Sequence, residues 1–187
     1  MCPRNLIIAA CLGLLATGCA RSTADLPAVR DFSLKQYSGT WYEVERFPHS
    51  FEEGLQSVSA TYTLLEDGGV RVINRGYDTQ AGHWKSVEGY AEPAGNPEVG
   101  LLDVTFFWPF YGTYKILALK GDPYSCALVT GDSYEYLWIL ARTPDPPEAT
   151  VRELRQKARR LGFDVSRLME VRHDRRYPGD LPPGNKR

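Results

Sequence analysis

The chain has 187 residues, of which 43% are hydrophobic and 24% charged, and its formal net charge is −1. This balance is typical of one globular domain and excludes an intrinsically disordered chain. No block of basic residues is present, which argues against nucleic acid as a partner. Aromatic residues and glycines are plentiful, and periodic apolar helix patterns are scarce before Pro147, so the composition favours an all-β fold.

Residues 1–18 have the pattern of an export signal and not of a folded segment. Arg4 supplies a positive start, an apolar run follows over residues 6–16, and Gly18 precedes Cys19. The run is too short for a permanent membrane-spanning helix. LATGC resembles the bacterial lipobox, in which the chain is cut before the cysteine and the cysteine is acylated. The alternative is an ordinary secretory signal that is cut nearby.

Acylation of Cys19 predicts a stable membrane anchor. Several acyl chains bind a protein firmly to a bilayer, whereas a single chain gives only marginal binding. No aspartate follows Cys19, and the bacterial sorting pattern then implies a lipid anchor in the outer membrane, facing the periplasm. Residues 19–33 are expected to form a lipidated, flexible tether. Cys126 would be the one thiol left in the mature chain, so we expect no intramolecular disulfide and interpret Cys126 as a packed side chain.

From Thr40 onward, short segments rich in β-branched and aromatic residues alternate with turn residues. Tight turns are expected at 66–69 and 121–123, and a long connection at 47–57. Eight antiparallel strands joined neighbour to neighbour fit an up-and-down β-barrel that has room for one small ligand. The predicted strands cover residues 40–46, 58–65, 70–77, 83–92, 99–107, 113–120, 124–131 and 134–142.

One α-helix is expected after the last strand. Asp145 could cap it, Pro146 would take its first position, and Gly162 would end it. A short strand within 165–172 completes a domain that spans residues 34–173, and residues 174–187 are expected to be a disordered tail. The apolar face of the helix, which should pack on the outside of the barrel, consists of Val151, Leu154, Ala158 and Leu161.

Three segments resemble signatures of the lipocalins. GTWYE at 39–43 is similar to their first-strand motif, GDPY at 121–124 to the turn of their second motif, and YLWILARTP at 136–144 to their last-strand motif that ends in arginine. With INRGY and FFWPFYG, the pattern resembles bacterial outer-membrane lipoprotein lipocalins of the apolipoprotein D-like group, over about residues 32–172. The resemblance implies a lipocalin barrel that binds lipids.

Trp41 and Arg142 stand at the ends of the first and last predicted strands and become neighbours only if the sheet closes. Arginine over an indole gains a cation–π contact of ~0.5–2 kcal/mol. We therefore interpret both as structural residues that close the barrel floor and not as ligand contacts. With the first strand running up from this floor, the connections at the open end are residues 47–57, 78–82, 108–112 and 131–134.

The aromatic segment FFWPFYG would form one lip of this open end, and Phe47, Phe51 and Leu55 the facing lip. Two interpretations are open. Such a rim can touch a bilayer or guide an acyl chain inward, or it can fold down and cap the barrel.

Alternation along the strands predicts which side chains line the cavity, counted from Arg142 on the last strand. Such a cavity favours a long apolar ligand with a polar end, which Arg46 or His49 could meet unless both are simply solvated. The predicted ligand-binding residues are Leu102, Val104, Phe106, Tyr114, Ile116, Ala118, Leu128, Thr130, Tyr136, Trp138 and Leu140.

Catalytic patterns are scarce. The three histidines lack metal-ligand spacing, and neither a GxSxG elbow nor a glycine-rich phosphate loop is present. Glu43 and Glu45 would share one face of the first strand, either as paired carboxylates or as partners of nearby cations. We therefore expect no catalytic residue, metal site or cofactor.

The leading hypothesis is an outer-membrane-anchored protein that binds and transports or stores fatty acids or lysophospholipids, for membrane biogenesis or repair. One alternative is a lipocalin-fold enzyme that acts on a lipid-like substrate. Another is a surface lipoprotein whose barrel serves only as a scaffold. The sequence is compatible with a homodimer as well as with a monomer.

Overall fold

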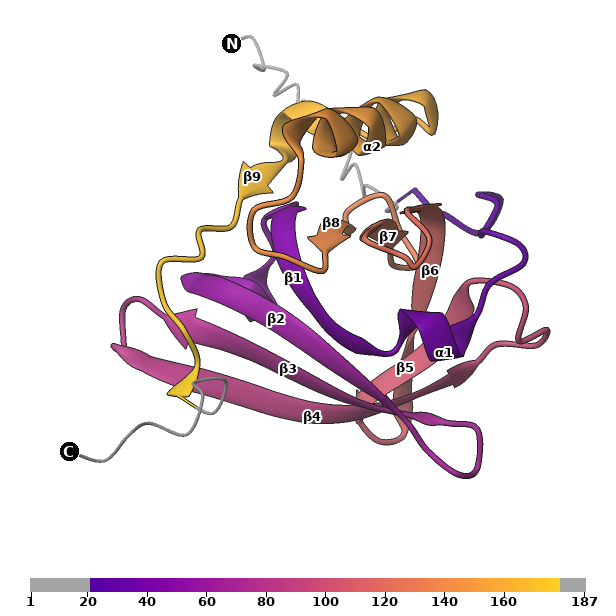
Figure 1. The fold of residues 1–187 in the computed structure, drawn as a ribbon, viewed down its shortest axis with the longest axis horizontal. Helices are drawn as coiled ribbons and strands as arrows, with labels where there is room; N and C mark the ends of the chain where they lie inside the picture. The colour runs from indigo at the N-terminus through magenta and orange to yellow at the C-terminus, as the bar shows by residue number, and fades with distance from the viewer. Residues whose placement is uncertain (1–20, 179–187) are drawn as a thin grey trace, which may run out of the picture.

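One antiparallel sheet that curls back on itself forms the body of the protein (Figure 1). The computed structural model describes residues 21–178. The expected export signal, Cys19 and most of the expected tail lie outside the described residues. The barrel strands are β1 (Gly39–Arg46), β2 (Leu55–Leu64), β3 (Val70–Asp78), β4 (His83–Pro93), β5 (Leu101–Phe107), β6 (Phe110–Lys120), β7 (Cys126–Thr130) and β8 (Leu137–Ala141).

The ring closes because β1 pairs with two strands. Residues 39–42 of β1 oppose β2, and its other edge opposes β8. Each remaining strand pairs with its sequence neighbours, so the connectivity is that of an up-and-down barrel. The eight-stranded antiparallel barrel predicted from the sequence is thus confirmed.

Successive strands run in opposite directions, so their connections gather at two ends of the barrel. Those after β1, β3, β5 and β7 lie at one end, called here the mouth, and those after β2, β4 and β6 lie at the other, called the floor. The short helix α1 (Leu34–Tyr37) precedes β1 at the floor and lies within the outline of the ring in Figure 1. Ser33 caps α1 by accepting a hydrogen bond from the backbone N–H of Gln36, and Tyr37 is fully buried.

The helix α2 (Glu148–Arg160) packs against the outer face of the barrel at β6 and β7, as the sequence predicts (Figure 1). It starts two residues later than expected, with Pro147 at the cap position and no side-chain cap. The ring of Pro147 disfavours a helical conformation at Pro146, so the helix begins after the second proline. The buried cluster between helix and barrel includes Val151, Leu154, Ala158, Phe47, Leu117, Cys126, Leu128, Leu137, Ile139 and Ala141.

After α2, a 3-10 turn (Val165–Arg167) and a ninth strand, β9 (Met169–Glu170), bring the chain back to the barrel. β9 pairs with Glu45 and Arg46 of β1. On the other side of this segment, the backbone N–H of Ser57 in β2 donates to the carbonyl of Arg172 over 2.7 Å. The C-terminal segment therefore fills a gap between β1 and β2 near the mouth.

Residues 174–178 differ from the disordered tail that the sequence predicts. The guanidinium of Arg175 lies 4.3 Å from the ring centre of Tyr77, and that of Arg75 lies 4.6 Å from the ring centre of Tyr177. Tyr177 also packs edge-on against Trp84. These stacked cations and rings hold the segment on the outer surface of β3 and β4.

Residues 21–33 do not form the flexible tether expected from the sequence. The backbone N–H of Thr23 donates to Asp132, and that of Val29 donates to Ile116. Lys115 donates to three backbone carbonyls of the segment, and the ring of Phe32 is buried in the barrel core. The segment is ordered because Phe32 is buried, Leu26 and Val29 are partly buried, and several of its backbone groups are paired.

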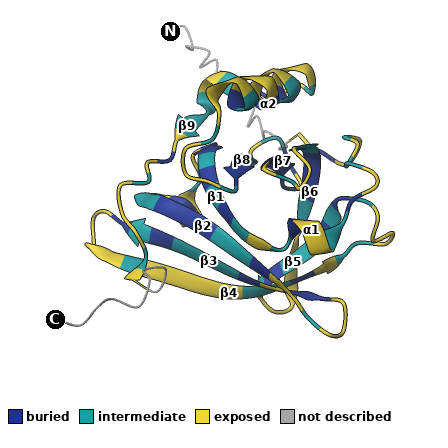
Figure 2. Ribbon diagram, viewed as in Figure 1, coloured by how far each residue is buried: buried dark blue, intermediate teal, exposed yellow. Residues whose placement is uncertain are grey.

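The wall of the barrel is incomplete between β4 and β5. Only residues 90–93 of β4 pair with β5. The preceding part of β4 is paired with β3 on one edge, and no described strand covers its other edge. Figure 2 shows this part of β4 as exposed.

Candidate functional site

The inner surface of the barrel carries an apolar wall. Residues that face each other across paired strands lie on the same side of a sheet, so Leu102 shares the side of Tyr114, and Val104 that of Ala91. Ala91 belongs to the buried interior cluster, against which Tyr114 and Val104 pack. The same inner cluster includes or contacts Phe106, Ile116, Trp138 and Leu140.

Several of these side chains are only partly buried, although they face the inside of the barrel. This holds for Val104, Phe106, Tyr114 and Trp138. Part of the inner wall is therefore accessible to solvent, and both the mouth and the unpaired edge of β4 open onto it. Tyr136 lies at the mouth end of the same wall, stacked on Trp138 with ring centres 6.0 Å apart.

The predicted inward direction is wrong for Ala118, Leu128 and Thr130. Leu128 is buried in the cluster beneath α2, and Thr130 stands two residues from it on the same face. Every residue of β7 is buried and both of its faces are apolar, so alternation gives no sign of its direction. Ala118 packs toward α2 because the pairing of β6 with β7 shifts between Ile116 and Ala118, which reverses the faces.

The inner wall also contains residues that the sequence analysis missed. On β7, Ala127 and Val129 point inward in place of Leu128 and Thr130, and on β6 Leu119 packs against the inner cluster. On the opposite wall the inner positions are Tyr62, Val70, Val72 and Ala91. Alternation along β3, where Val70 and Val72 are separated by a charged residue, is a signal that could have found two of them.

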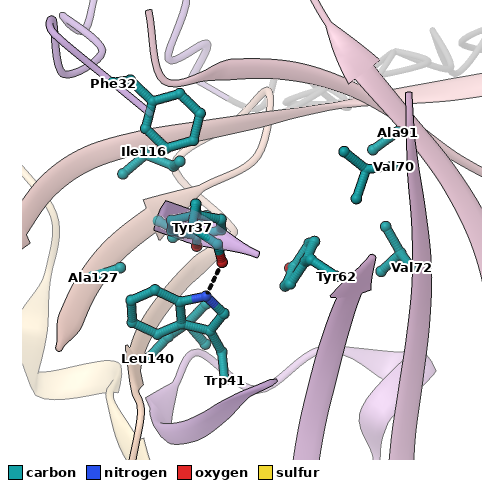
Figure 3. Packing of buried hydrophobic residues seen from close by; sticks show 11 residues of the cluster. Phe32, Tyr37, Trp41, Tyr62, Val70, Val72, Ala91, Ile116, Ala127 and Leu140 are labelled. Atoms are coloured by element: carbon teal, nitrogen blue, oxygen red, sulfur yellow. Dashed lines mark hydrogen bonds between the residues drawn. The ribbon is translucent and has the colours of Figure 1, made fainter. Parts of the chain in front are cut away.

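A cluster of aromatic rings closes the floor (Figure 3). The indole N–H of Trp41 donates to the carbonyl of Tyr37 over 2.8 Å. The hydroxyls of Tyr37 and Tyr62 lie 2.7 and 3.0 Å from that of Tyr114. Burial raises the pKa of all three tyrosines, so their hydroxyls stay neutral and satisfy each other at the closed end.

Below this cluster, the guanidinium of Arg142 lies 3.9 Å from the ring centre of Trp41. The two residues lie where the sequence predicts that the first and last strands meet. Trp41 and Arg142 both use their polar groups in contacts within the fold, which fits a structural role at the floor.

Near the mouth, charged groups are buried inside the barrel. Glu43 opposes the inward Leu140, and Arg46 opposes the inward Trp138, because a bulge at Val44 shifts the register of β1 by one residue. The Arg46 side chain is 2% exposed, and its Nη1 donates to Glu43 over 3.1 Å. The same bulge turns Glu45 outward, where it binds Arg155 of α2. The expectation that Glu43 and Glu45 share a face is therefore wrong.

The connection after β1 completes this polar cluster. Glu52, in a 3-10 turn (Ser50–Glu52), has its carboxylate 3.4 Å from Arg46 Nε and 3.1 Å from His49 Nε2. Neither contact is aligned as a hydrogen bond, so Arg46 Nε and both ring nitrogens of His49 are buried without a hydrogen-bond partner among residues 21–178. The indole N–H of Trp138 reaches the same carboxylate at 3.5 Å.

The pKa values of the two acids in the polar cluster, Glu43 and Glu52, are shifted in opposite directions. Burial, assisted by the neighbouring Glu52 carboxylate, raises the pKa of Glu43 well above its usual range. Burial acts in the same direction on Glu52, but His49 and Arg46 outweigh it and lower its pKa. The arrangement therefore favours a neutral Glu43 beside a charged pair of Arg46 and Glu52.

A cleft of about 380 Å³ opens beside this cluster. Its walls are Arg46, Pro48, His49, Ser50, Glu52, Glu53, Gly54 and Met169. A second cleft of the same volume lies on the outside, between α2 and β6.

The two expected lips of the mouth differ in structure. Phe107, Trp108, Phe110 and Tyr111 are exposed, whereas Phe47 is fully buried beneath α2. Phe47 was expected in the facing lip, and the bulge at Val44 is the reason that it turns outward from the barrel and into the helix contact. Phe51 remains exposed at the mouth.

Within residues 21–178, no group of three or more His, Cys, Asp or Glu side chains is placed to hold a metal ion. Cys126 is buried beneath α2, and burial raises the pKa of its thiol. The helices of the described chain are too short or too polar to cross a bilayer.

Comparison with known proteins agrees with this geometry. A family model described as a lipocalin-like domain matches residues 32–173, the segment that forms the barrel and its helix. The chain belongs to the lipocalin-like family.

Curated relatives extend over most of this lipocalin. It is 45% identical over 168 residues to the outer membrane lipoprotein Blc of Escherichia coli, covering 89% of this chain and 94% of that protein. It is 32% identical over 151 residues to rat apolipoprotein D, covering 76% and 77% of the two chains. Among solved structures, insecticyanin from the tobacco hornworm Manduca sexta matches with a TM-score of 0.68 at 19% identity, over 82% of this chain and 87% of that one, which supports the fold alone.

Proposed function

We propose that this lipocalin binds single-chain amphiphiles such as fatty acids and lysophospholipids inside its barrel. It would carry or store them at the outer membrane, anchored through an acylated Cys19 and facing the periplasm. The observation that carries the proposal is the combination, within one ring, of a partly exposed apolar wall and a buried polar cluster at the open end. The names of relatives such as the outer membrane lipoprotein Blc support the location.

The two ends of the barrel differ in the polar groups that they offer to a ligand. The tyrosine hydroxyls at the floor satisfy each other, so they offer little to a polar group. At the mouth, Arg46 Nε and the His49 ring nitrogens have no hydrogen-bond partner in the part of the chain that the structure describes. An anionic head group would share these nitrogens with the Glu52 carboxylate, which lies 3.4 Å from Arg46 Nε and 3.1 Å from His49 Nε2, and a neutral Glu43 would add no second negative charge. The acyl chain would then run along Trp138, Phe106 and Val104 toward the floor.

A displacement assay with a fluorescent fatty acid tests the proposal on the purified protein. Each added methylene should improve affinity by about fourfold, since its burial contributes ~0.8 kcal/mol, until the interior is filled. A fatty acid should also bind more tightly than the alcohol of equal chain length, because only the acid places a charge beside Arg46. If no long-chain amphiphile binds at micromolar concentration, the proposal fails.

Mass spectrometry of protein extracted from native membranes tests the anchor and identifies the bound molecule. Acylation at Cys19 and a co-purified amphiphile are the expected results. Incubation with purified lipids addresses the enzyme alternative, because a carrier returns its lipid unchanged, whereas a chemically altered lipid would favour catalysis.

A further inference from the structure

The tip of the β5–β6 hairpin is a cluster of exposed aromatic side chains. The exposed fractions are 75% for Phe107, 81% for Trp108, 77% for Phe110 and 49% for Tyr111. These four residues, called here the aromatic tip, point away from the barrel and do not cap it. Residues 104–114 contain no charged side chain. Such a group of rings in water is unfavourable and marks contact with an apolar partner.

The start of the described chain lies at the same end of the barrel. The hydroxyl of Thr23 donates to the carbonyl of Gly131 over 2.6 Å, and Ser22 forms a β-bridge with Ser133. Both partners belong to the connection between β7 and β8. Because strands alternate in direction, this connection and the β5–β6 connection are both at the mouth.

The N-terminal segment is held there firmly. Nζ of Lys115 donates to the carbonyls of Thr23, Ala24 and Leu26 over 2.7–3.2 Å. The guanidinium of Arg21 lies 4.0 Å from the ring centre of Tyr134. Cys19 precedes Arg21 by two residues, and two residues of extended chain reach at most about 7 Å. An acylated Cys19 would therefore meet its membrane close to the mouth.

We propose that the aromatic tip docks into the bilayer that holds the acyl chains of Cys19, so that the mouth of the barrel faces the membrane surface. The proposal rests on the acylation of Cys19 in the proposed function and adds a second, non-covalent membrane contact. Phe51, exposed by 62% on the β1–β2 connection, lies at the same end and supplies a further apolar contact.

The chemistry of the tip fits a bilayer better than a protein partner. Tryptophan and tyrosine have apolar rings with a polar group and are enriched at membrane interfaces. A specific protein interface buries more than about 1,000 Å² in total, which one two-residue hairpin connection hardly supplies. A bilayer needs no complementary shape and accepts single side chains.

The orientation would let a lipid pass between bilayer and barrel without crossing bulk water. Phe106 faces the interior and is followed directly by the exposed Phe107. The side chains of one hairpin thus run from the inner wall to the tip.

The test uses the full acylated protein in vesicles of phosphatidylethanolamine and phosphatidylglycerol that carry bromine at defined depths of the acyl chains. Subtracting the tryptophan emission of a Trp108→Phe variant isolates the signal of Trp108. We expect a blue-shifted emission that the bromine nearest the head groups quenches most strongly. A Phe107→Ser, Phe110→Ser double variant should shift this emission toward that of indole in water.

A matched control places a tryptophan at the floor. Leu64, 44% exposed at the end of β2, can be changed to tryptophan in the Trp108→Phe background, and its emission should not be quenched. An unquenched Trp108 with water-like emission would overturn the proposal. A blue-shifted but unquenched Trp108 would indicate burial against a second copy of the chain and would overturn it as well.

Fatty-acid displacement on the same samples separates this proposal from the proposed function. The tip variants should keep the displacement constant of the unchanged protein, because their side chains lie outside the inner wall. Loss of quenching with intact ligand binding and an acylated Cys19 would reject the docking alone. Absence of acylation, seen by mass spectrometry, would reject the anchor and with it the docking.

Discussion

Arg142 stacks on Trp41, with its guanidinium carbon 3.9 Å from the ring centre, and donates to five backbone carbonyls besides. This one side chain thereby joins β1, α1 and the turn before β7. The carbonyls belong to Gln36, Tyr37, Ser38, Thr40 and Tyr124.

Replacing Arg142 by lysine should lower the free energy of unfolding by about 2–4 kcal/mol. Lysine keeps the charge but cannot stack its flat face on the indole or serve five acceptors at once. Urea denaturation followed by far-ultraviolet circular dichroism measures the change. Arg152→Lys on α2 is the matched control, because Arg152 is 53% exposed and its one salt bridge within the described residues is with Glu148, so its effect should stay within about 0.5 kcal/mol. Equal effects of the two variants would contradict the structural role of Arg142.

The buried Glu43 should make stability depend on pH. Its pKa in the folded protein is raised above the ordinary value of 4.5, so the folded state keeps its proton to higher pH than the unfolded state. The stability associated with this proton is complete below pH 4.5 and decreases as pH rises toward the folded-state pKa. Denaturation midpoints from pH 4.5 upward should therefore fall for the unchanged protein relative to Glu43→Gln. Two parallel curves would contradict a raised pKa.

Substitutions at Leu128 and at Trp138 should affect stability and ligand binding differently. Leu128→Ala should cost about 2–5 kcal/mol of stability, since it empties a buried site beneath α2, and should leave the fatty-acid dissociation constant of the folded protein unchanged. Trp138→Ala removes a ring from the inner wall and should weaken binding by at least about tenfold. Displacement titrations and denaturation of both variants check this. A binding defect in Leu128→Ala without one in Trp138→Ala would show that the ligand lies elsewhere.

Lys115→Met should release the N-terminal segment. The substitution leaves one buried and two partly buried carbonyls without their donor and should cost about 1–3 kcal/mol. Hydrogen exchange should become faster at the amides of Thr23, Leu26 and Val29, which are hydrogen-bonded in the structure. Lys120→Met is the control, because Lys120 is 40% exposed and forms its salt bridge with Glu153 on the outer surface. Unchanged exchange in Lys115→Met would mean that other contacts hold the segment.

Alternation predicts the inner wall correctly where a strand contains a fixed reference point. Counting back from Arg142 places Leu140 and Trp138 inward and leaves Leu137 and Ile139 toward α2, as observed. The same rule fails on β7, where both faces are buried, because a strand between cavity and helix shows no polarity difference.

β-Bulges are the main reason why the sequence does not predict every side chain that faces the interior of the barrel. One extra residue at Val44 turns Arg46 into the barrel and Phe47 out of it. The hydrophobic pattern of the sequence does not indicate this bulge. The polar cluster also needs Glu52, which a connection without regular alternation brings into place. In the N-terminal segment, the apolar residues Val29 and Phe32 were a signal that this part of the chain packs against the barrel.

The placement of β9 between β1 and β2 has a consequence for the order of assembly. Val171 donates its backbone N–H to the carbonyl of Val44, a partner 127 positions earlier in the chain. A contact of such sequence separation forms only after nearly the whole polypeptide has emerged, and closing so long a loop carries an entropic cost. During synthesis or export from the N-terminus, the gap between β1 and β2 would thus stay unfilled until the C-terminal segment has emerged. A chain truncated before Val171 could not fill it.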